Sequence, residues 1–154
     1  MTSIESMAEE TLVEHAPLRD PHYGQPARAP GGLAGWRIRK LAAYVESNIA
    51  DSITASELAA LVGLSIGHFS RMFRHSFGMP PHRYIMQRRM VRAQVLMTTS
   101  LQSLACVALE CGLTDQAHLS RLFRRIVGMS PSAWRREALL RLARNPENRD
   151  PWRG

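Results

Sequence analysis

The fold is decided by residues 103–136, which read SLACVALECGLTDQAHLSRLFRRIVGMSPSAWRR. Apolar residues recur at i, i+3, i+4 and i+7 on both sides of Gly112, which predicts one buried face on each of two short helices. These residues are Leu104, Val107, Ala108 and Cys111 before the glycine, and Leu119, Leu122, Phe123 and Ile126 after it. Gly112 can adopt the left-handed conformation that ends a helix, and Thr114 is expected to cap the next helix. The stretch therefore predicts a helix-turn-helix.

The outer face of the second helix is polar and basic. The residues predicted on it are Gln116, His118, Ser120, Arg121, Arg124 and Arg125, with Asp115 as the only acid. Hydrogen-bond donors and positive charge on one helix face suit the major groove of DNA. From this stretch alone, an ordinary helical hairpin with a solvated basic face is the alternative, because short helix pairs around a glycine turn are common.

The same unit occurs a second time upstream. Gly63-Leu64-Ser65 resembles Gly112-Leu113-Thr114 at an offset of 49, and HFSRMFR (68–74) resembles HLSRLFR (118–124) at an offset of 50. One extra residue therefore follows the second turn. The repeat continues into GMPP (78–81) and GMSP (128–131), so an internal duplication predicts two helix-turn-helix units, at about 54–77 and about 103–127.

Three further helices are expected. The first begins at Trp36 and ends near residues 48–51, with its apolar stripe on Trp36, Ile38, Leu41, Ala42, Val45 and Ile49. The second, at about 81–98, begins at Pro81, is uninterrupted by Gly or Pro and is about 27 Å long at about 1.5 Å per residue. This is a suitable spacer between two helices that enter successive major grooves about 34 Å apart. The last runs from Pro131, after a Ser130 cap, to about Arg144, with Trp134, Ala138, Leu139 and Leu142 inward. Thr54 and Glu57 also predict a capping box.

Composition favours an anionic partner. The chain of 154 residues has a net charge of +7, and 19 of its 20 basic residues are arginine, whose fork matches phosphate oxygens and guanine edges. Residues 60–136 carry a net +9, whereas residues 1–34 carry −3. An acidic membrane surface or protein could also meet a basic face, but membrane binding would need an exposed apolar face, and the predicted apolar faces belong to the core.

The ends of the chain and the cysteines indicate a cytoplasmic protein. Residues 1–35 are expected to be a disordered tail rich in Pro and Gly, and residues 146–154 a polar tail, on either side of a domain at 36–145. No signal peptide and no run of 18 apolar residues is present. Cys106 and Cys111 lie five residues apart on one predicted helix, point in divergent directions and should not form a disulfide. We therefore expect a bacterial cytoplasmic protein, on the nucleoid when bound to DNA.

These motifs resemble the DNA-binding domain of the AraC/XylS family of transcription regulators. The resemblance covers about 70% of the chain. Its carriers are Leu58-Ala59, Gly63-Leu64-Ser65, Phe69-Ser70-Arg71-x-Phe73-Arg74, Gly78-x-x-Pro81, Arg89-x-x-x-Ala93-x-x-Leu96-Met97, Val107-Ala108-x-x-Cys111-Gly112-Leu113, His118-Leu119-Ser120-Arg121-x-Phe123-Arg124, Gly128-x-Ser130-Pro131 and Trp134-Arg135. The resemblance implies an all-α fold of seven helices, with two homeodomain-like units joined by one long helix.

The resemblance also implies the DNA contacts. Carried over position by position, base contacts would come from Ile66, Gly67, Ser70, Arg71, Gln116, Ala117, Ser120 and Arg121. Arg71 and Arg121 are the best candidates, because a guanidinium can bind guanine O6 and N7 in a bidentate way; a solvated or phosphate-binding arginine is the alternative. Gly67 and Ala117 are smaller than the residues often found there in the family. Phosphate contacts are expected from Ser65, Arg74, Thr114, Arg124 and Arg125.

Other residues carry simpler interpretations. His68 and His118 are assigned to DNA contact or helix packing, because no Cys/His set has zinc spacing, and we expect neither a metal nor a cofactor. Trp36 and Trp134 are interpreted as core residues. Some DNA repair proteins with this fold have a reactive cysteine, but Cys106 and Cys111 are interpreted as small core residues. No catalytic arrangement of residues is recognisable, so an enzyme is not expected.

The sequence thus predicts a regulator that binds double-stranded DNA in a sequence-specific manner. It is expected to bind as a monomer, to activate transcription and to contact RNA polymerase, without a ligand-sensing domain, because 35 residues are too few to enclose a small-molecule pocket. The alternative is an interaction protein that binds RNA polymerase or another regulator and has weak affinity for DNA.

Overall fold

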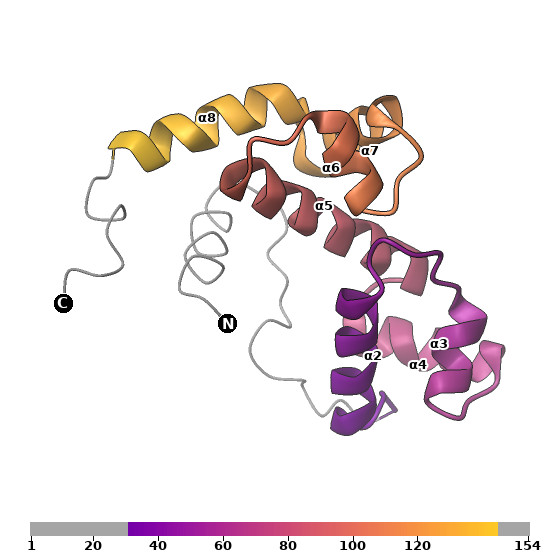
Figure 1. Ribbon diagram of the computed structural model, residues 1–154. Coiled ribbons are helices and arrows are strands. Elements are labelled where there is room, and N and C mark those ends of the chain that lie inside the picture. Colours follow the sequence, from indigo (N-terminus) through magenta and orange to yellow (C-terminus); the bar gives the residue numbers. More distant parts are fainter. Residues whose placement is uncertain (1–30, 145–154) are drawn as a thin grey trace. The chain divides into compact units, whose positions relative to one another are not determined.

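The computed structural model describes residues 31–144, in which every regular element is a helix (Figure 1). The seven helices of this range are α2 (Gly35–Ser47), α3 (Ala55–Leu61), α4 (Ile66–Phe77), α5 (Pro81–Thr99), α6 (Leu104–Glu110), α7 (Gln116–Val127) and α8 (Pro131–Arg144). The predicted all-α class is confirmed. The structure does not describe residues 1–30 of the predicted tail 1–35, nor residues 145–154, which include all of the predicted tail 146–154. Within the described part, no helix is long and apolar enough to cross a membrane.

The described residues form two compact units that divide within α5, at Arg89 and Met90. The first unit packs α2, α3, α4 and the start of α5. Phe73 stacks on Phe77 with ring centroids 4.1 Å apart and contacts Phe69 and Tyr84 at 5.4 and 5.7 Å. The other buried apolar residues of this unit are Leu33, Leu41, Val45, Ile49, Leu58, Ala59, Val62 and Ile85.

The second unit packs α6, α7, α8 and the rest of α5. Phe123 of α7 meets Trp134 of α8 edge to face, with ring centroids 5.9 Å apart. The buried position of Trp134 agrees with the sequence prediction. The other buried apolar residues of this unit are Met90, Ala93, Leu96, Met97, Val107, Ala108, Cys111, Leu113, Leu119, Leu122 and Val127.

The turns and caps of the first unit follow the sequence closely. Gly63 has φ 68°, in the left-handed region that ends α3. The predicted capping box is present: the Glu57 amide donates to Thr54 Oγ1 at 3.2 Å, and the Thr54 amide donates to Glu57 Oε2 at 2.8 Å. Hydrogen bonds from the Thr54 hydroxyl and amide hold the pKa of Glu57 below its ordinary value. Ser65 caps α4, as predicted, by accepting a hydrogen bond from the His68 amide.

In the second unit one predicted cap is wrong. Gly112 has φ 69° as expected, but α7 is capped by Asp115, whose Oδ1 accepts from the His118 amide at 2.6 Å. Thr114 was expected to be the cap because it follows the turn at the same distance as Ser65 does. The extra residue in this turn moves the helix start, so that Asp115, 50 residues after Ser65, takes the capping position. The Ser130 cap is confirmed by the Ala133 amide, which donates to Ser130 Oγ at 3.3 Å.

Three residues expected in the core are exposed. Trp36 is 51% exposed and lies against the Arg37 guanidinium, 5.0 Å from the ring centroid. Leu139 is 43% exposed, and Cys106 is also exposed, whereas Cys111 is buried. Trp36 and Leu139 stand five residues from the buried Leu41 and Trp134, and Cys106 stands one residue before the buried Val107, so each side chain lies off the buried stripe of its helix. Cys106 and Cys111 form no disulfide with each other, as predicted.

The core also begins earlier than expected. Leu33 was assigned to the disordered tail, but it is 6% exposed, and its amide donates to Ser76 Oγ at 2.7 Å. The sequence did not predict this burial, because a single leucine in front of α2 shows no helical periodicity.

One arginine in each unit holds a loop through backbone carbonyls. In the first unit the buried Arg89 donates from Nε to the Ile49 carbonyl at 3.2 Å and from Nη2 to the Asp51 carbonyl at 2.7 Å. In the second unit Arg135 donates to the carbonyls of Met97, Ser100 and Gln102 at 3.0, 3.2 and 2.7 Å. Each loop leads into the first helix of a helix-turn-helix, so these arginines fix where α3 and α6 begin.

Candidate nucleic-acid interface

The second helix of the first unit, α4, has one buried and one open side. Phe69, Phe73 and Phe77 form the buried side. The four predicted base-contact residues occupy i, i+1, i+4 and i+5, which is one continuous face of the N-terminal half of the helix. On this face Gly67 and Arg71 are exposed, Ile66 is 54% exposed, and Ser70 is half-buried. The structure therefore brings these four residues together at the surface.

The second helix of the second unit, α7, repeats this arrangement. Leu119, Leu122, Phe123 and Val127 form its buried side. Gln116, Ala117 and Arg121 are exposed and Ser120 is half-buried. Each residue stands 50 positions after its counterpart on α4. Both helices thus present the same four positions at the surface, with different side chains at the first two.

The predicted phosphate contacts form the rest of each surface. Arg74 on α4 and both Arg124 and Arg125 in the last turn of α7 are exposed, as are Ser65 and Thr114 before the two helices. His75 was not among the predicted contacts, although it is exposed and occupies the position equivalent to Arg125. The offset of 50 would have identified it.

The arginines of both surfaces have no carboxylate partner in the part of the chain that the structure describes. Within residues 31–144, the guanidinium groups form no ion pair at Arg71, Arg74, Arg121, Arg124 or Arg125. An exposed guanidinium without a carboxylate partner has all its N–H groups available to a phosphate or a guanine edge. The two helices can therefore bind anions through five separate guanidinium groups.

The two helix N-termini differ in charge. At α4 the neutral Ser65 hydroxyl accepts a weak hydrogen bond of 3.4 Å from the His68 amide. At α7 the Asp115 carboxylate places a negative charge at the corresponding position, and the Thr114 hydroxyl lies 3.0 Å from His118 Nδ1. A carboxylate there satisfies the positive end of the helix dipole that a phosphate would otherwise meet. The α4 terminus is thus the better phosphate site of the two.

Gly67 stands on the open side of α4 with space around it. A Cβ atom built at this position would meet no heavy atom within 4 Å, and its backbone is that of an ordinary helix. Nothing in the described fold therefore requires a glycine there. The absence of a side chain leaves the backbone of α4 open to close approach, as the small side chain of Ala117 does on α7.

The described residues offer no cluster of three or more His, Cys, Asp or Glu side chains that could bind a metal ion. His68 is exposed on α4, and His118 is half-buried beside Thr114. The groups that both open surfaces share are therefore those of arginine and serine side chains, and the Asp115 carboxylate lies beside His118 at the start of α7.

Residues 58–137 match the family model described as a helix-turn-helix domain, which is more than half of the chain. The chain belongs to this AraC-type helix-turn-helix family. It is 35% identical over 106 residues to the HTH-type transcriptional activator RhaS of Klebsiella pneumoniae, an alignment that covers 68% of this chain and 38% of the relative. It is 32% identical over 91 residues to the probable transcriptional regulator LumQ of Photobacterium leiognathi, which covers 59% and 37%. This AraC-type chain therefore aligns with less than half the length of these curated relatives.

Solved structures show the same architecture. The DNA-binding domain of the global transcriptional factor AdpA, in complex with a target DNA, is 31% identical with a TM-score of 0.63, covering 72% of this chain and 97% of that chain. The C-terminal domain of the response regulator yesN from Fusobacterium nucleatum is 27% identical with a TM-score of 0.60, covering 64% and 96%. The family expected from the sequence is confirmed.

Proposed function

We propose that this chain is a transcription regulator that binds double-stranded DNA in a sequence-specific manner through α4 and α7, each in a major groove. The observation that carries the proposal is the duplication of one surface: two helices expose matching arginines, free of ion pairs within the described residues, above matching buried faces. The AdpA domain, a solved relative at 31% identity, is in complex with DNA. Two such helices in successive major grooves suit an asymmetric site of about 20 base pairs bound by a monomer.

The proposed base contacts are those on the N-terminal half of each helix. Arg71 and Arg121 are proposed to bind guanine in a bidentate way, worth about 1–3 kcal/mol of discrimination each. Gln116 can donate to and accept from adenine, and Ile66 can contact a thymine methyl group. Gly67, Ala117, Ser70 and Ser120 permit close approach of the helix to the base edges.

The proposed phosphate contacts surround these positions. Arg74, Arg124 and Arg125 would fix the orientation of each helix without distinguishing bases, together with Ser65 and Thr114. We therefore expect Arg124→Ala to weaken binding to all sequences alike and to lower the salt slope by about one, whereas Arg121→Ala should relax preference at one base position. Equal and uniform loss in both variants would show that the base contacts are assigned wrongly.

The cellular role is proposed from the relatives' names and from the charge of the chain. RhaS is named an activator, and we propose that this chain also activates transcription, in contact with RNA polymerase, in the cytoplasm and on the nucleoid. We propose further that residues 36–145 form its DNA-binding domain and that this domain has no catalytic activity.

Selection from random DNA followed by footprinting tests the proposal. The expected result is enrichment of one asymmetric motif that is protected over two helical turns. Recovery of DNA without any common motif, at every salt concentration, would overturn it.

A second candidate is an interaction protein that binds RNA polymerase or another regulator and has weak affinity for DNA. Gly67 and Ala117 favour this second candidate, because neither provides a long side chain that could reach a base from the centre of its surface. The same selection separates the two candidates, since an interaction protein would enrich no motif and would still bind its protein partner.

A further inference from the structure

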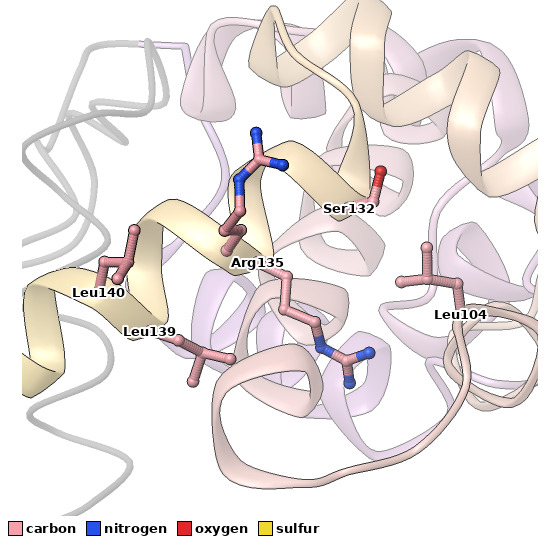
Figure 2. A pocket seen from close by; sticks show the side chains of 6 residues that line it. Leu104, Ser132, Arg135, Leu139 and Leu140 are labelled. Atoms are coloured by element: carbon pink, nitrogen blue, oxygen red, sulfur yellow. The ribbon is translucent and has the colours of Figure 1, made fainter.

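An apolar groove of about 450 Å³ lies between the start of α6 and the outer side of α8. Figure 2 shows Leu139 and Leu140 on α8 and Leu104 across the groove from them. Leu139 and Leu140 are 43% and 51% exposed. Adjacent large apolar side chains at the surface of a soluble domain mark a binding site more often than chance exposure. The groove is separate from the open faces of α4 and α7, since none of the residues proposed to contact DNA lines it.

The rim of this groove is positively charged. The helix α8 carries Arg135, Arg136, Arg141 and Arg144 against Glu137 as its one acid. Arg135 is held by three loop carbonyls and Arg141 pairs with Glu137 at 2.9 Å. Arg136, which lines the groove, is exposed and forms no ion pair within the described residues. The groove therefore fits an amphipathic segment that combines aliphatic and acidic side chains.

The N-terminal sequence of this chain has that composition. Residues 1–15 contain no Lys or Arg and carry four acids, which are Glu5, Glu9, Glu10 and Glu14. Apolar residues of the same stretch have helical spacing, with Ile4, Met7, Ala8 and Leu12 at i, i+3, i+4 and i+8. A helix formed from this stretch would present one apolar stripe bordered by carboxylates on both sides.

We propose that residues 4–14 dock in the groove lined by Leu104, Leu139 and Leu140, with their glutamates facing Arg136. The apolar stripe of this segment is thin, so the free peptide would bind weakly. Residues 16–30 tether it to the domain, and a tether of this length gives an effective concentration on the order of millimolar, at which weak contacts form. The N-terminal segment thus shields the exposed leucines of α8.

The chain contains its own site for attaching a spectroscopic probe. Cys106 on α6 is exposed, and Cys111 is buried, so a nitroxide reagent labels Cys106. Cys106 lies two residues after Leu104, which lines the groove. In the ¹⁵N-labelled protein we expect the amide signals of residues 4–14 to lose most of their intensity, relative to the sample with reduced nitroxide, and those of residues 20–28 to lose much less.

Charge reversal supplies the matched controls. Arg136→Glu should restore the intensities of residues 4–14, and so should the double change Glu9→Arg with Glu10→Arg. In the protein with all three changes, the signals of residues 4–14 should again lose intensity, because opposite charges face each other again. Arg92→Glu, an exposed arginine of α5 that does not line the groove, should have no effect.

Three results would overturn the proposal. The first is full intensity of residues 4–14 in the labelled wild-type protein. The second is a loss of intensity that appears only when ¹⁵N-enriched protein without nitroxide is mixed with unenriched protein that carries the nitroxide. The segment would then dock on a second copy of the chain. A loss of intensity that Arg136→Glu does not change would also contradict it, because the segment would then lie near Cys106 without using the groove. DNA binding is not part of any of these readouts, so the proposed function can fail or hold independently.

Discussion

The two helices proposed to contact DNA, α4 and α7, share the same length and end geometry and differ in the side chains proposed to distinguish bases. Each has 12 residues and ends at a glycine with positive φ, 69° at Gly78 and 90° at Gly128. Arg71 and Arg121 correspond at an offset of 50, but Ile66 corresponds to Gln116. An aliphatic side chain can contact a thymine methyl group, whereas an amide favours adenine. The two copies thus share the geometry that exposes this position and differ in the chemistry of its side chain.

The cores beneath the two helices also differ. Four aromatic rings meet under α4, whereas under α7 Phe123 meets the single ring of Trp134. Aromatic pairs contribute about 0.5–1.5 kcal/mol each beyond the area they bury. The first unit should therefore depend more on its aromatic residues than the second.

The largest expected effect tests this difference in the cores. Phe73→Ala and Phe123→Ala each remove a fully buried ring and should lower the free energy of unfolding by about 3–5 kcal/mol. Phe73→Ala should lie at the upper end, because Phe73 contacts three rings. Urea unfolding followed by circular dichroism measures both. An equal or greater loss for Phe123→Ala would remove the proposed asymmetry.

The two loop-holding arginines give the next effect. Arg135→Lys keeps the charge, but an ammonium cannot replace a fork that binds three carbonyls, and hydrogen bonds of charged groups contribute about 1.5–3 kcal/mol. We expect amide hydrogen exchange to accelerate in α6 for Arg135→Lys and in α3 for Arg89→Lys. If either variant accelerated exchange equally in both helices, the loops would not be held separately.

A smaller effect concerns the glycine of α4. Gly67→Ala should raise the free energy of unfolding by about 0.5–1 kcal/mol, because glycine inside a helix is costly and the added Cβ meets nothing within 4 Å. Ala117→Gly is the reciprocal change on α7 and should lower stability by a similar amount. Thermal unfolding of both variants measures the two changes. A loss of stability in Gly67→Ala would mean that the added methyl group meets a steric obstacle on α4.

The smallest effect comes from the caps of α3 and α6. Glu57 completes a capping box, whereas Cys106 occupies the equivalent position after Ser103. The pKa of Glu57 is lowered in the folded state, so its contribution to stability is complete above its ordinary value near 4.5 and disappears as the pH falls through the lowered value. Wild type should therefore be more stable than Glu57→Gln at pH 7, and the two should converge in acid. A difference that stays constant with pH would exclude the carboxylate as its source.

Periodicity predicted the helices well because each one has a buried face. It failed at Trp36, Cys106 and Leu139 for one geometric reason. Each of these residues lies off the buried stripe of its own helix, even though its type is apolar or small. Counting positions, instead of residue types, would have placed all three at the surface.

The remaining differences depend on contacts between distant residues. The capping role of Asp115 could have been found by aligning the two helices, since it stands 50 residues after Ser65. The burial of Leu33 and the carbonyl contacts of Arg135 could not, because both depend on partners distant in sequence, such as Ser76 and Met97. The groove on α8 likewise could not be predicted, because Leu104 of α6 and Leu139 of α8 line it together and are distant in sequence.

The central claim is that α4 and α7 contact separate halves of one DNA site. Selection from random DNA with wild type, Arg71→Ala and Arg121→Ala tests it most directly. Each variant should lose preference at one base position, and the two positions should lie about one helical turn, roughly 10 base pairs, apart. Loss at the same position in both variants, or an unchanged motif in both, would contradict the claim.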